Sequence, residues 1–503
     1  MQYYYGYRHY QIYVLSSKFF SVLFLSCLFS LISRLFFKLF FVIVLILLFC
    51  SFNVKALSAV TIKIIEGSEP YLTFDKGKTK VTDANILSVI TFSDGTTMSS
   101  TTNTSSSENP IALPKEGETI KDITMMIPII NRPINLKTII GPPYSYWGDD
   151  DGDGQGTDGI SATGNISVNV TDKNGSIVNA DTALDICKAP YLIDFDTSGV
   201  WSLSTKYGIP SIAMLYMRPV KYYIKPNSAP AVCMLVPSLF ASPANTEVWR
   251  WSKGFYAQSR DPATYERNFP TTGGNNLFFD LEISGIDESE LTWPPVTHEG
   301  ITATVTRSEH NELWLNPTPK VVTRVTLTGP AATTTQQSSN SPGAIYRPQL
   351  PQTFELVGYD RNNKPVIKYG FILKQWFIAR GKKLSNMANN QAWCNSTGYR
   401  VPLVKDLTNA IPDPNSPAEN QGFVGAKPES HGNYFERQIG AGFMSEWGVL
   451  DFYNDAVFSG AMLITSEFSD ASGVWPWIVN MAGGGVYPKR SQDPIFTVIC
   501  AYP

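Results

Sequence analysis

The stretch "AWCNSTGYRVPLVKDLTNAI", residues 392–411, decides how the C-terminal part of this sequence is interpreted. It contains one cysteine, Cys394, and the chain ends on the apolar run "FTVICAYP", residues 496–503, which contains Cys500. A long region rich in glycine, aromatic and polar residues lies between the two cysteines. This arrangement suggests a module that opens on one cysteine and closes on the other.

Two short helices are predicted around this stretch. Within residues 387–394, Met, Ala, Gln and Cys side chains share one helical face, and Ser385 is the expected N-cap. Within residues 403–411, directly after Pro402, apolar residues recur at i, i+4, i+7 and i+8 and predict a second helix. The final runs of the chain alternate as strands do, so residues 370–503 are expected to form an α+β module.

Upstream, short alternating apolar runs are separated by turn residues. Examples are "NISVNVTD" (165–172) and "ITATVTR" (301–307), which predict the strands of β-sandwich modules. The stretch "GPAATTTQQSSNSPG" (329–343) has the composition of a linker or a long loop. The chain is therefore expected to be mainly β before its α+β end.

Composition excludes one class of partner. The formal net charge of the 503 residues is −3, but residues 1–56 carry five Lys or Arg and no acid, which leaves 35 basic against 43 acidic residues in the remainder. Nucleic-acid binding requires clustered cations, so a net acidic body argues against a nucleic-acid partner.

The first 56 residues have the character of a membrane-directed segment. Residues 19–33 and 39–52 are apolar runs, and the second has about the length of a signal-peptide core. We expect cleavage after Ala56, and the alternatives are an uncleaved anchor or a true start near Arg34. Contact with a membrane is expected only through this segment.

Cysteine usage agrees with export. Once the two cysteines of the N-terminal segment are set aside, four remain, and none forms a CxxC pair of the kind that binds zinc or does thioredoxin chemistry. A sparse, even set behind an export signal indicates disulfides. Of the three pairings that four cysteines allow, we favour nearest neighbours, Cys187–Cys233 and Cys394–Cys500.

The C-terminal motifs carry a family resemblance. The order "AWC", "GYRVP", "LTNA", "GAGFMSEWG", "ITSEF", "WIVNMAGGGVY" and "FTVICAYP", within residues 370–503, resembles the C-type-lectin-like domains of bacterial adhesins, such as the tip of intimin and invasin and the C-terminal domain of collagen-like adhesins. The upstream part resembles the Ig-like stalk modules of such proteins.

The resemblance implies a fold and a division into domains. It implies Ig-like β-sandwich modules followed by a C-type-lectin-like α+β domain, with a disulfide from the first helix to the last strand. The expected divisions are an N-terminal segment (1–56), a β-sandwich region (57–260), an Ig-like domain (261–369) and the lectin-like domain (370–503). The triplets Glu-Pro-Asn, Gln-Pro-Asp and Trp-Asn-Asp of calcium-dependent sugar binders are absent from residues 370–503, so calcium-mediated sugar binding is not expected there.

An acidic loop is the candidate metal site. In "YWGDDDGDGQGTDG", Asp149, Asp151 and Asp153 occupy alternate positions before a turn glycine, and Asp158 follows. This matches the first half of a calcium loop, but the twelfth position is isoleucine instead of glutamate. The two interpretations left open are a calcium site and a solvated acidic turn.

The candidate ligand-binding residues lie late in the C-terminal module. Trp475 and Trp477 are aromatic faces of the kind that bind sugar rings or protein receptors, although both also fit a core strand. Glu467, Asp470 and Asn480 are close in sequence and are expected to supply polar contacts.

Catalytic signals are weak. The sequence contains no HExxH, GxSxG, P-loop or dinucleotide motif, and Glu446 and Asp451 are expected to be solvated. "YRVPLVKDL" resembles loosely a segment of formylglycine-generating enzymes, but those need a reactive cysteine pair within their site. We therefore expect a non-catalytic adhesin at the cell surface or secreted, which recognises a host glycan or receptor protein; the alternatives are a structural envelope or matrix protein and, less favoured, such an enzyme.

Overall fold

The computed structural model describes residue 42 and residues 66–503 except 82, 128, 153, 155–158, 241–245, 311–319, 418–420, 459, 472 and 490–495. By its contacts the chain divides into residues 1–66 and residues 67–503. Apart from residue 42, the expected membrane-directed runs and the cleavage point lie outside the described residues. Within the described part, no helix is both long enough and apolar enough to cross a membrane.

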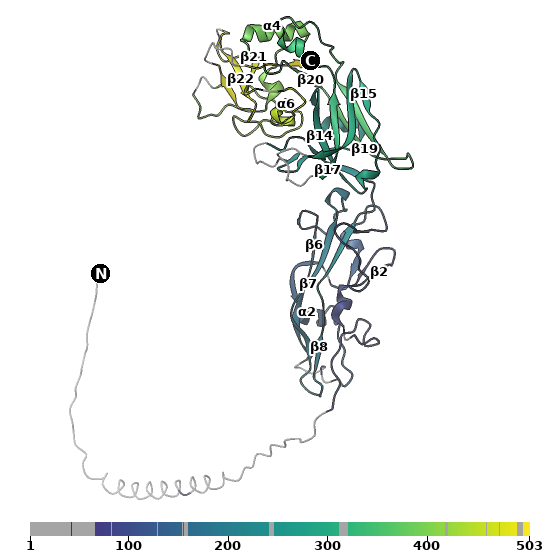
Figure 1. Ribbon diagram of the computed structural model, residues 1–503. Helices are drawn as coiled ribbons and strands as arrows, with labels where there is room; N and C mark the ends of the chain where they lie inside the picture. The colour runs from purple at the N-terminus through teal and green to yellow at the C-terminus, as the bar shows by residue number, and fades with distance from the viewer. Residues whose placement is uncertain are drawn as a thin grey trace, which may run out of the picture. The chain divides into compact units, whose positions relative to one another are not determined.

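The first part of residues 67–503 is built on a six-stranded sheet with the order β3-β9-β7-β6-β5, in which β8 also pairs with β7. A three-stranded sheet, β2-β1-β4, and helix α2 accompany it (Figure 1). Alternate side chains of β6, including Ile166, Val168 and Val170, are at most 1% exposed, as expected for a strand with one face on a core. The bounds are β1 Ile90–Thr91, β2 Thr97–Met98, β3 Ile111–Ala112, β4 Thr124–Met125, β5 Ile130–Asn135, α2 Leu136–Ile140, β6 Ser161–Thr171, β7 Tyr191–Ser204, β8 Ile212–Leu215 and β9 Val220–Lys225.

A seven-stranded sheet follows, with the order β11-β12-β10-β14-β17-β16-β15. The hairpin β18–β19 packs on it through aromatic side chains, because Phe279 of β14 meets Phe371 of β19 edge to face at 6.1 Å between ring centroids. The bounds are β10 Ala231–Val236, β11 Trp249–Arg250, β12 Gly254–Tyr256, β14 Leu277–Ser284, β15 Val296–His298, β16 Ile301–His310, β17 Lys320–Thr328, β18 Gln352–Tyr359 and β19 Pro365–Leu373.

The C-terminal part is α+β. Strand β20 pairs in parallel with β13 and antiparallel with the last strand, β24, while β21-β22-β23 form a separate sheet. The bounds are β13 Thr272–Gly274, α3 Thr334–Ser338, β20 Gln375–Ala379, α4 Met387–Thr397, α5 Val404–Leu407, α6 Phe443–Trp447, β21 Met462–Phe468, β22 Pro476–Asn480, β23 Val486–Pro488 and β24 Ile499–Tyr502. Single turns of 3-10 helix are η2 Ala84–Ser88, η3 Ile120–Asp122, η5 Ile186–Lys188, η6 Pro262–Arg267, η7 Glu288–Glu290 and η9 Leu450–Phe452. The predicted fold class, mainly β with an α+β end, is confirmed.

A disulfide closes the C-terminal part. Cys394 of α4 is bonded to Cys500 of β24, with 5.6 Å between their Cα atoms and 106 residues between them in sequence. In Figure 1, α4, β20 and the C-terminus accordingly lie together. The other bond joins Cys187 to Cys233. These are the two pairs expected from the sequence.

Two local predictions need correction. The N-cap of α4 is Asn386, whose side chain accepts a hydrogen bond from the backbone N–H of Asn389 at 2.9 Å, so Ser385 is one residue too early. The second helix is a single turn that ends at Leu407, because Thr408 has extended backbone angles. The predicted position directly after Pro402 is confirmed.

The stretch 329–343 is not a free linker. It contains α3, and its backbone is held by side chains on both sides: Trp393 Nε1 donates to the carbonyl of Gln336 at 2.9 Å, and Arg380 Nη2 donates to the carbonyl of Ser339 at 3.1 Å. The composition predicted a linker or a long loop, and the backbone here accepts hydrogen bonds from Arg380, which follows β20, and from Trp393 of α4.

Replacing both Cys394 and Cys500 by alanine should lower the free energy of unfolding by about 2–5 kcal/mol, because the bond closes a long loop in the unfolded chain. Denaturant titration followed by tryptophan fluorescence measures this, since Trp376, Trp393, Trp447 and Trp477 are all buried. An unchanged midpoint and slope would show that the bond contributes nothing.

Candidate functional site

The C-terminal loops are held in place by a buried carboxylate, that of Glu446 in α6. Its two oxygens accept hydrogen bonds from the backbone N–H and the hydroxyl of Thr271, from the same two groups of Thr272, and from the N–H of Gly440, at 2.5 to 3.1 Å. The side chain is fully buried. One carboxylate therefore joins the C-terminal α6 region to the strand β13, which lies more than 170 residues earlier in sequence.

The expectation that Glu446 is solvated is wrong. Burial raises the pKa of Glu446, and the hydrogen bonds from Thr272, Gly440 and Thr271 act in the opposite direction. A carboxylate that accepts this many donors has a structural role, because each donor would otherwise be buried without a partner. Asp451, by contrast, is exposed, as expected.

The next residue, Trp447, reinforces the same junction. Its Nε1 donates to the carbonyl of Thr272 at 3.1 Å, and its ring lies 5.0 Å from that of Phe269. Trp447 belongs to the core, since it is 0% exposed.

A buried arginine adds a second contact between the two regions. The guanidinium of Arg437 lies 4.3 Å from the ring centre of Trp249, and its Nη2 donates to the carbonyl of Ser238 at 3.0 Å. Burial lowers the pKa of Arg437 to about 9. Gly448, with φ +74°, leaves the space this arginine needs, because an added Cβ would lie 2.3 Å from its Nη1 atom.

The predicted ligand-binding residues are distributed along β21, β22 and their connecting loop. Trp477 is 1% exposed and packs edge to face on Phe423, so it belongs to the core and is removed from the candidate surface. Trp475 is half-buried just before β22, and its backbone N–H donates to Asp470 Oδ1 at 3.0 Å. The two tryptophans therefore have different environments.

The remaining predicted residues, Glu467 and Asn480, are half-buried and hold loop backbone. Glu467 Oε2 accepts from the N–H of Val404 at 2.5 Å, and Asn480 Oδ1 accepts from the N–H of Ala482 at 2.7 Å. Because Asp470 and these two side chains each bond the backbone, they order the loops around the candidate surface. Whether they also contact a ligand stays a prediction.

Sequence reasoning missed two exposed tyrosines, Tyr434 and Tyr487, which are 37% and 42% exposed. Tyr487 lies opposite Ile478, which lies opposite Ile464, so these three residues occupy one row across the sheet. Exposure rises along that row from 0% through 8% to 42% as it reaches the edge strand β23. Tyr434 is brought beside this edge by Asn433, whose side chain bonds both the carbonyl and the N–H of Val486 at 2.8 and 2.6 Å.

The run of glycines at 483–485 is the sequence pattern that could have indicated the surface of Tyr434 and Tyr487. The N–H of Phe435 donates to the carbonyl of Gly483 at 2.8 Å, and Gly484 has φ +71°. A Cβ on Gly485 would lie 2.8 Å from the Tyr487 hydroxyl and 2.9 Å from the carbonyl of Asn433. The glycines thus permit a close approach of two backbone segments, and the two tyrosines flank it.

The acidic loop makes structural hydrogen bonds in the described residues. Asp151 Oδ2 accepts from the N–H of Ser68 at 2.6 Å, and Asp149 Oδ2 accepts from the N–H of Gly154 at 3.0 Å. Asp153 and Asp158 lie outside the described residues. Among those described, no group of three or more His, Cys, Asp or Glu side chains is placed to hold a metal ion. Calcium binding by this loop stays a prediction.

Comparisons with known proteins give structural neighbours only. No protein-family model matches the chain, and no curated protein sequence matches it. A crystal structure of invasin, described as a bacterial integrin-binding protein, aligns over 68% of this chain and 51% of its own, at 14% identity and a TM-score of 0.30. The chain therefore spans about half of the invasin chain.

Two intimin structures are also similar in part. A C-terminal 282-residue fragment of intimin, in complex with the intimin-binding domain of the translocated intimin receptor, aligns over 68% of this chain and 93% of its own, at 11% identity and a TM-score of 0.29. An intimin mutant from EHEC O157:H7 aligns over 47% and 89%, at 11% identity and a TM-score of 0.25.

Replacing Glu446 by glutamine should lower the free energy of unfolding by about 2–4 kcal/mol. The NH₂ group of the new amide would face the buried N–H and hydroxyl groups that now donate to the carboxylate, and it cannot accept hydrogen bonds from them. Denaturant titration measures the loss. The matched control is Glu467→Gln in β21, a half-buried side chain that retains an acceptor for its single bond and should change stability by less than about 1 kcal/mol. Equal effects of the two changes would contradict a special role for Glu446.

Proposed function

We propose that this protein is an exported adhesin-like binding protein, which recognises a receptor protein or glycan on a cell surface through its C-terminal part. The proposed contact surface, here called the tyrosine edge, consists of Tyr434, Tyr487 and the half-buried Trp475. The observation that carries the proposal is the exposure of tyrosines on a frame fixed by a disulfide and a buried carboxylate.

Physical chemistry favours this surface for recognition. Tyrosine offers a large apolar ring and a hydroxyl with little conformational entropy to lose, and aromatic residues dominate the binding energy of protein interfaces. Aromatic faces also stack on sugar rings. Further apolar side chains of the same sheet and its hairpin loop, Phe468 and Val474, are 39% and 53% exposed. Exposed apolar groups near aromatic anchors are typical of binding sites.

The order of motifs in residues 370–503 supports assigning this part as C-type-lectin-like and the upstream sheets as Ig-like modules. For the module boundaries we propose one change to the expected divisions. Strands β10, β11 and β12 belong to the same sheet as β14 to β17, so we propose that the boundary expected at residue 260 lies within 226–230. The boundary near 369 is kept, placed at the end of β19 after Leu373, although β13 pairs with β20 across it.

Export and a surface or secreted location are part of the proposal. They rest on the apolar N-terminal runs and on two disulfides, which form in oxidising compartments. The protein is proposed to be non-catalytic. The competing function is a structural envelope or matrix protein without a cell-surface ligand, and binding to cells distinguishes the two.

Changing both Tyr434 and Tyr487 to alanine should weaken saturable binding of residues 57–503 to cultured animal cells by at least about tenfold, because two anchor side chains are lost. Flow cytometry of the labelled, oxidised protein measures it. The matched control changes Tyr207 and Tyr216, which are 54% and 75% exposed in the first part of the chain. This control should bind normally, and thermal unfolding should be unchanged in both variants.

Two outcomes would count against the proposal. If the unchanged protein binds neither cells nor a glycan array saturably, the structural function is favoured. If the two double variants lose binding equally, the contact surface is not the tyrosine edge.

A further inference from the structure

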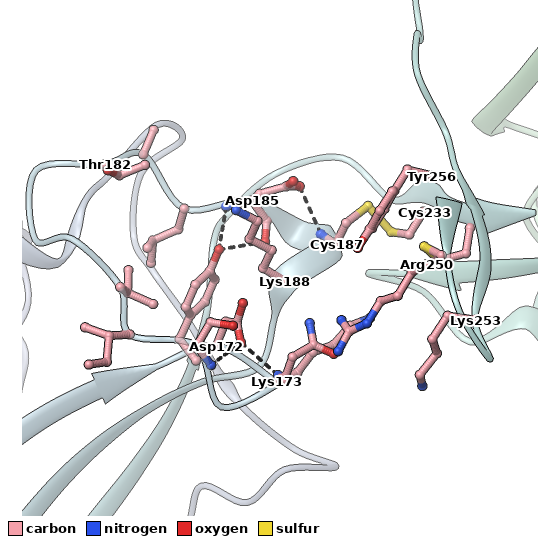
Figure 2. Close-up of a pocket in the computed structure, with 18 of the residues that line it drawn as sticks. Asp172, Lys173, Thr182, Asp185, Cys187, Lys188, Cys233, Arg250, Lys253 and Tyr256 are labelled. Atoms are coloured by element: carbon pink, nitrogen blue, oxygen red, sulfur yellow. Dashed lines mark hydrogen bonds between the residues drawn. A yellow bond between two sulfur atoms is a disulfide. The ribbon is translucent and has the colours of Figure 1, made fainter. Parts of the chain in front are cut away.

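A pocket of about 510 Å³ lies at the Cys187–Cys233 disulfide. One wall is formed by residues 172–191, and the other by β10, the β11–β12 hairpin and Glu282 of β14. Figure 2 shows Arg250 and Lys253 on the hairpin side, facing Lys173 and Lys188. The volume falls in the range of roughly 300–1,000 Å³ that is typical of small-ligand sites.

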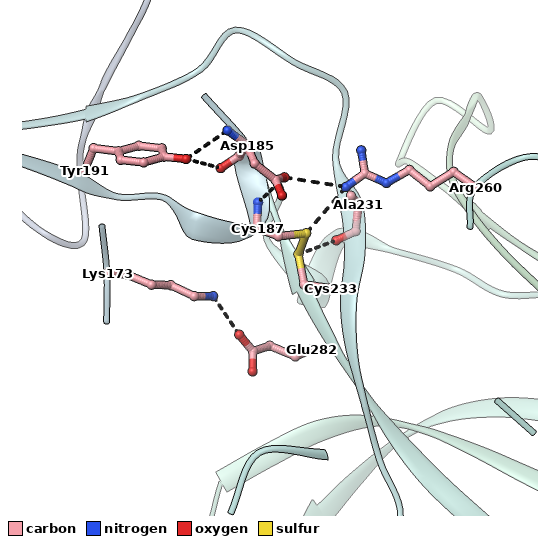
Figure 3. The surroundings of a disulfide bond; sticks show 8 residues. All are labelled: Lys173, Asp185, Cys187, Tyr191, Ala231, Cys233, Arg260 and Glu282. Atoms are coloured by element: carbon pink, nitrogen blue, oxygen red, sulfur yellow. Dashed lines mark hydrogen bonds and ion pairs between the residues drawn. A yellow bond between two sulfur atoms is a disulfide. The ribbon is translucent and has the colours of Figure 1, made fainter. Parts of the chain in front are cut away.

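The two walls are joined by covalent and ionic contacts. Cys187 and Cys233 are bonded with 5.3 Å between their Cα atoms, and Lys173 Nζ lies 2.7 Å from Glu282 Oε1 (Figure 3). Both contacts connect residues 172–188 to strands of the seven-stranded sheet. The pocket is therefore preformed, which lowers the entropic cost of binding a ligand.

The acidic groups that line the pocket already have donors. Asp172 Oδ1 accepts from the N–H groups of Asn174 and Ser176 at 2.8 and 3.0 Å. Asp185 Oδ1 accepts from the N–H of Cys187 at 3.0 Å and lies 3.8 Å from Arg260 Nη2. Glu282 is paired with Lys173 as described above. Lys173 and Arg260 therefore offset the charges of Glu282 and Asp185, whereas Asp172 keeps its charge and is stabilised by backbone N–H groups.

Three other cationic side chains line the pocket. Within the described part of the chain, Lys188, Arg250 and Lys253 take part in no ion pair or side-chain hydrogen bond. Lys188 and Lys253 are exposed and Arg250 is half-buried, so all three can reach a ligand in the pocket. The arginine fork suits bidentate contact with a carboxylate or sulfate, and the lysines supply point charges.

The rest of the lining suits a sugar. Tyr256, 38% exposed, offers an aromatic face, while Asn179 and Thr182 offer amide and hydroxyl groups. A mixture of aromatic face, amides and cations matches a ring that carries hydroxyl and anionic substituents. A free inorganic anion would leave most of this volume unused.

We propose that this pocket binds an acidic saccharide, a sulfated or carboxylated sugar chain, through Lys188, Arg250 and Lys253. The site is separate from the tyrosine edge and does not depend on it. Polyanion binding by general attraction is disfavoured, because the chain after residue 56 has more acidic than basic residues. Affinity must therefore come from the local cation cluster.

The test is calorimetric titration of oxidised residues 57–503 with three oligosaccharides of equal length: a heparin-derived sulfated one, an oligogalacturonate that carries only carboxylates, and a neutral one. Saturable binding of at least one acidic oligosaccharide, and none of the neutral one, is expected. The affinity should fall as sodium chloride is raised, because the contacts are ionic. Binding of the oligogalacturonate would show that carboxylates suffice, whereas binding of the heparin-derived oligosaccharide alone would show that sulfate groups are needed.

The decisive variant is Lys188→Gln with Arg250→Gln and Lys253→Gln, which should bind at least tenfold more weakly. The matched control is Lys78→Gln with Lys137→Gln and Lys364→Gln, three exposed lysines elsewhere, which makes the same change in net charge and should bind within twofold of the unchanged protein. No saturable binding of either acidic oligosaccharide, or equal losses in both variants, would overturn the proposal.

This test is independent of the proposed receptor function. The Tyr434→Ala/Tyr487→Ala variant should retain full affinity for the acidic oligosaccharide, because neither tyrosine lines the pocket. If that variant lost both affinities together, the pocket would not be a separate site. If cell binding failed while saccharide binding persisted, only the receptor proposal would fall.

Discussion

The carboxylate of Glu446 is the interaction on which the C-terminal part of this structure depends. Burying an ionisable group is costly, and the cost is offset only when enough donors converge on it. Thr271, Thr272 and Gly440 supply these donors. Because Thr272 begins β13 and Thr271 directly precedes it, these bonds fix the position of α6 and its flanking loops against that strand. Trp447 and Arg437 then pack into the same junction.

This junction explains how long irregular loops can present a defined surface. The Cys394–Cys500 bond fixes the ends of the C-terminal part, and the Glu446 cluster fixes its middle. Between them, the side chains of Glu467 and Asn433 bond the backbone at the first residues of α5 and β23. The tyrosine edge is therefore carried by a frame that is held at several points, and little ordering remains to oppose binding.

Much of the local structure could be predicted from the sequence. The alternating apolar runs 165–172 and 301–307 are strands in the structure, because a period of two places one face on a core. The even, sparse set of cysteines behind an expected export signal predicted disulfides, and the two favoured pairs are the two observed bonds. The wrong predictions concern residues whose surroundings are formed by segments that are distant in sequence. Glu446 was expected in solvent, and Trp477 was kept as a ligand contact, because neighbours in sequence do not reveal what a side chain meets across the fold.

The sequence by itself determined the mainly β character with its α+β end, the paired cysteines and the excess of acidic residues after residue 56, because these follow from local periodicity, spacing and composition. Only the tertiary structure decided the burial of Glu446, the exposure of Tyr434 and Tyr487, and the cation cluster of Lys188, Arg250 and Lys253. The physical reason is distance in the chain. Lys188 and Arg250 come from separate segments, and only folding places their charges around one pocket.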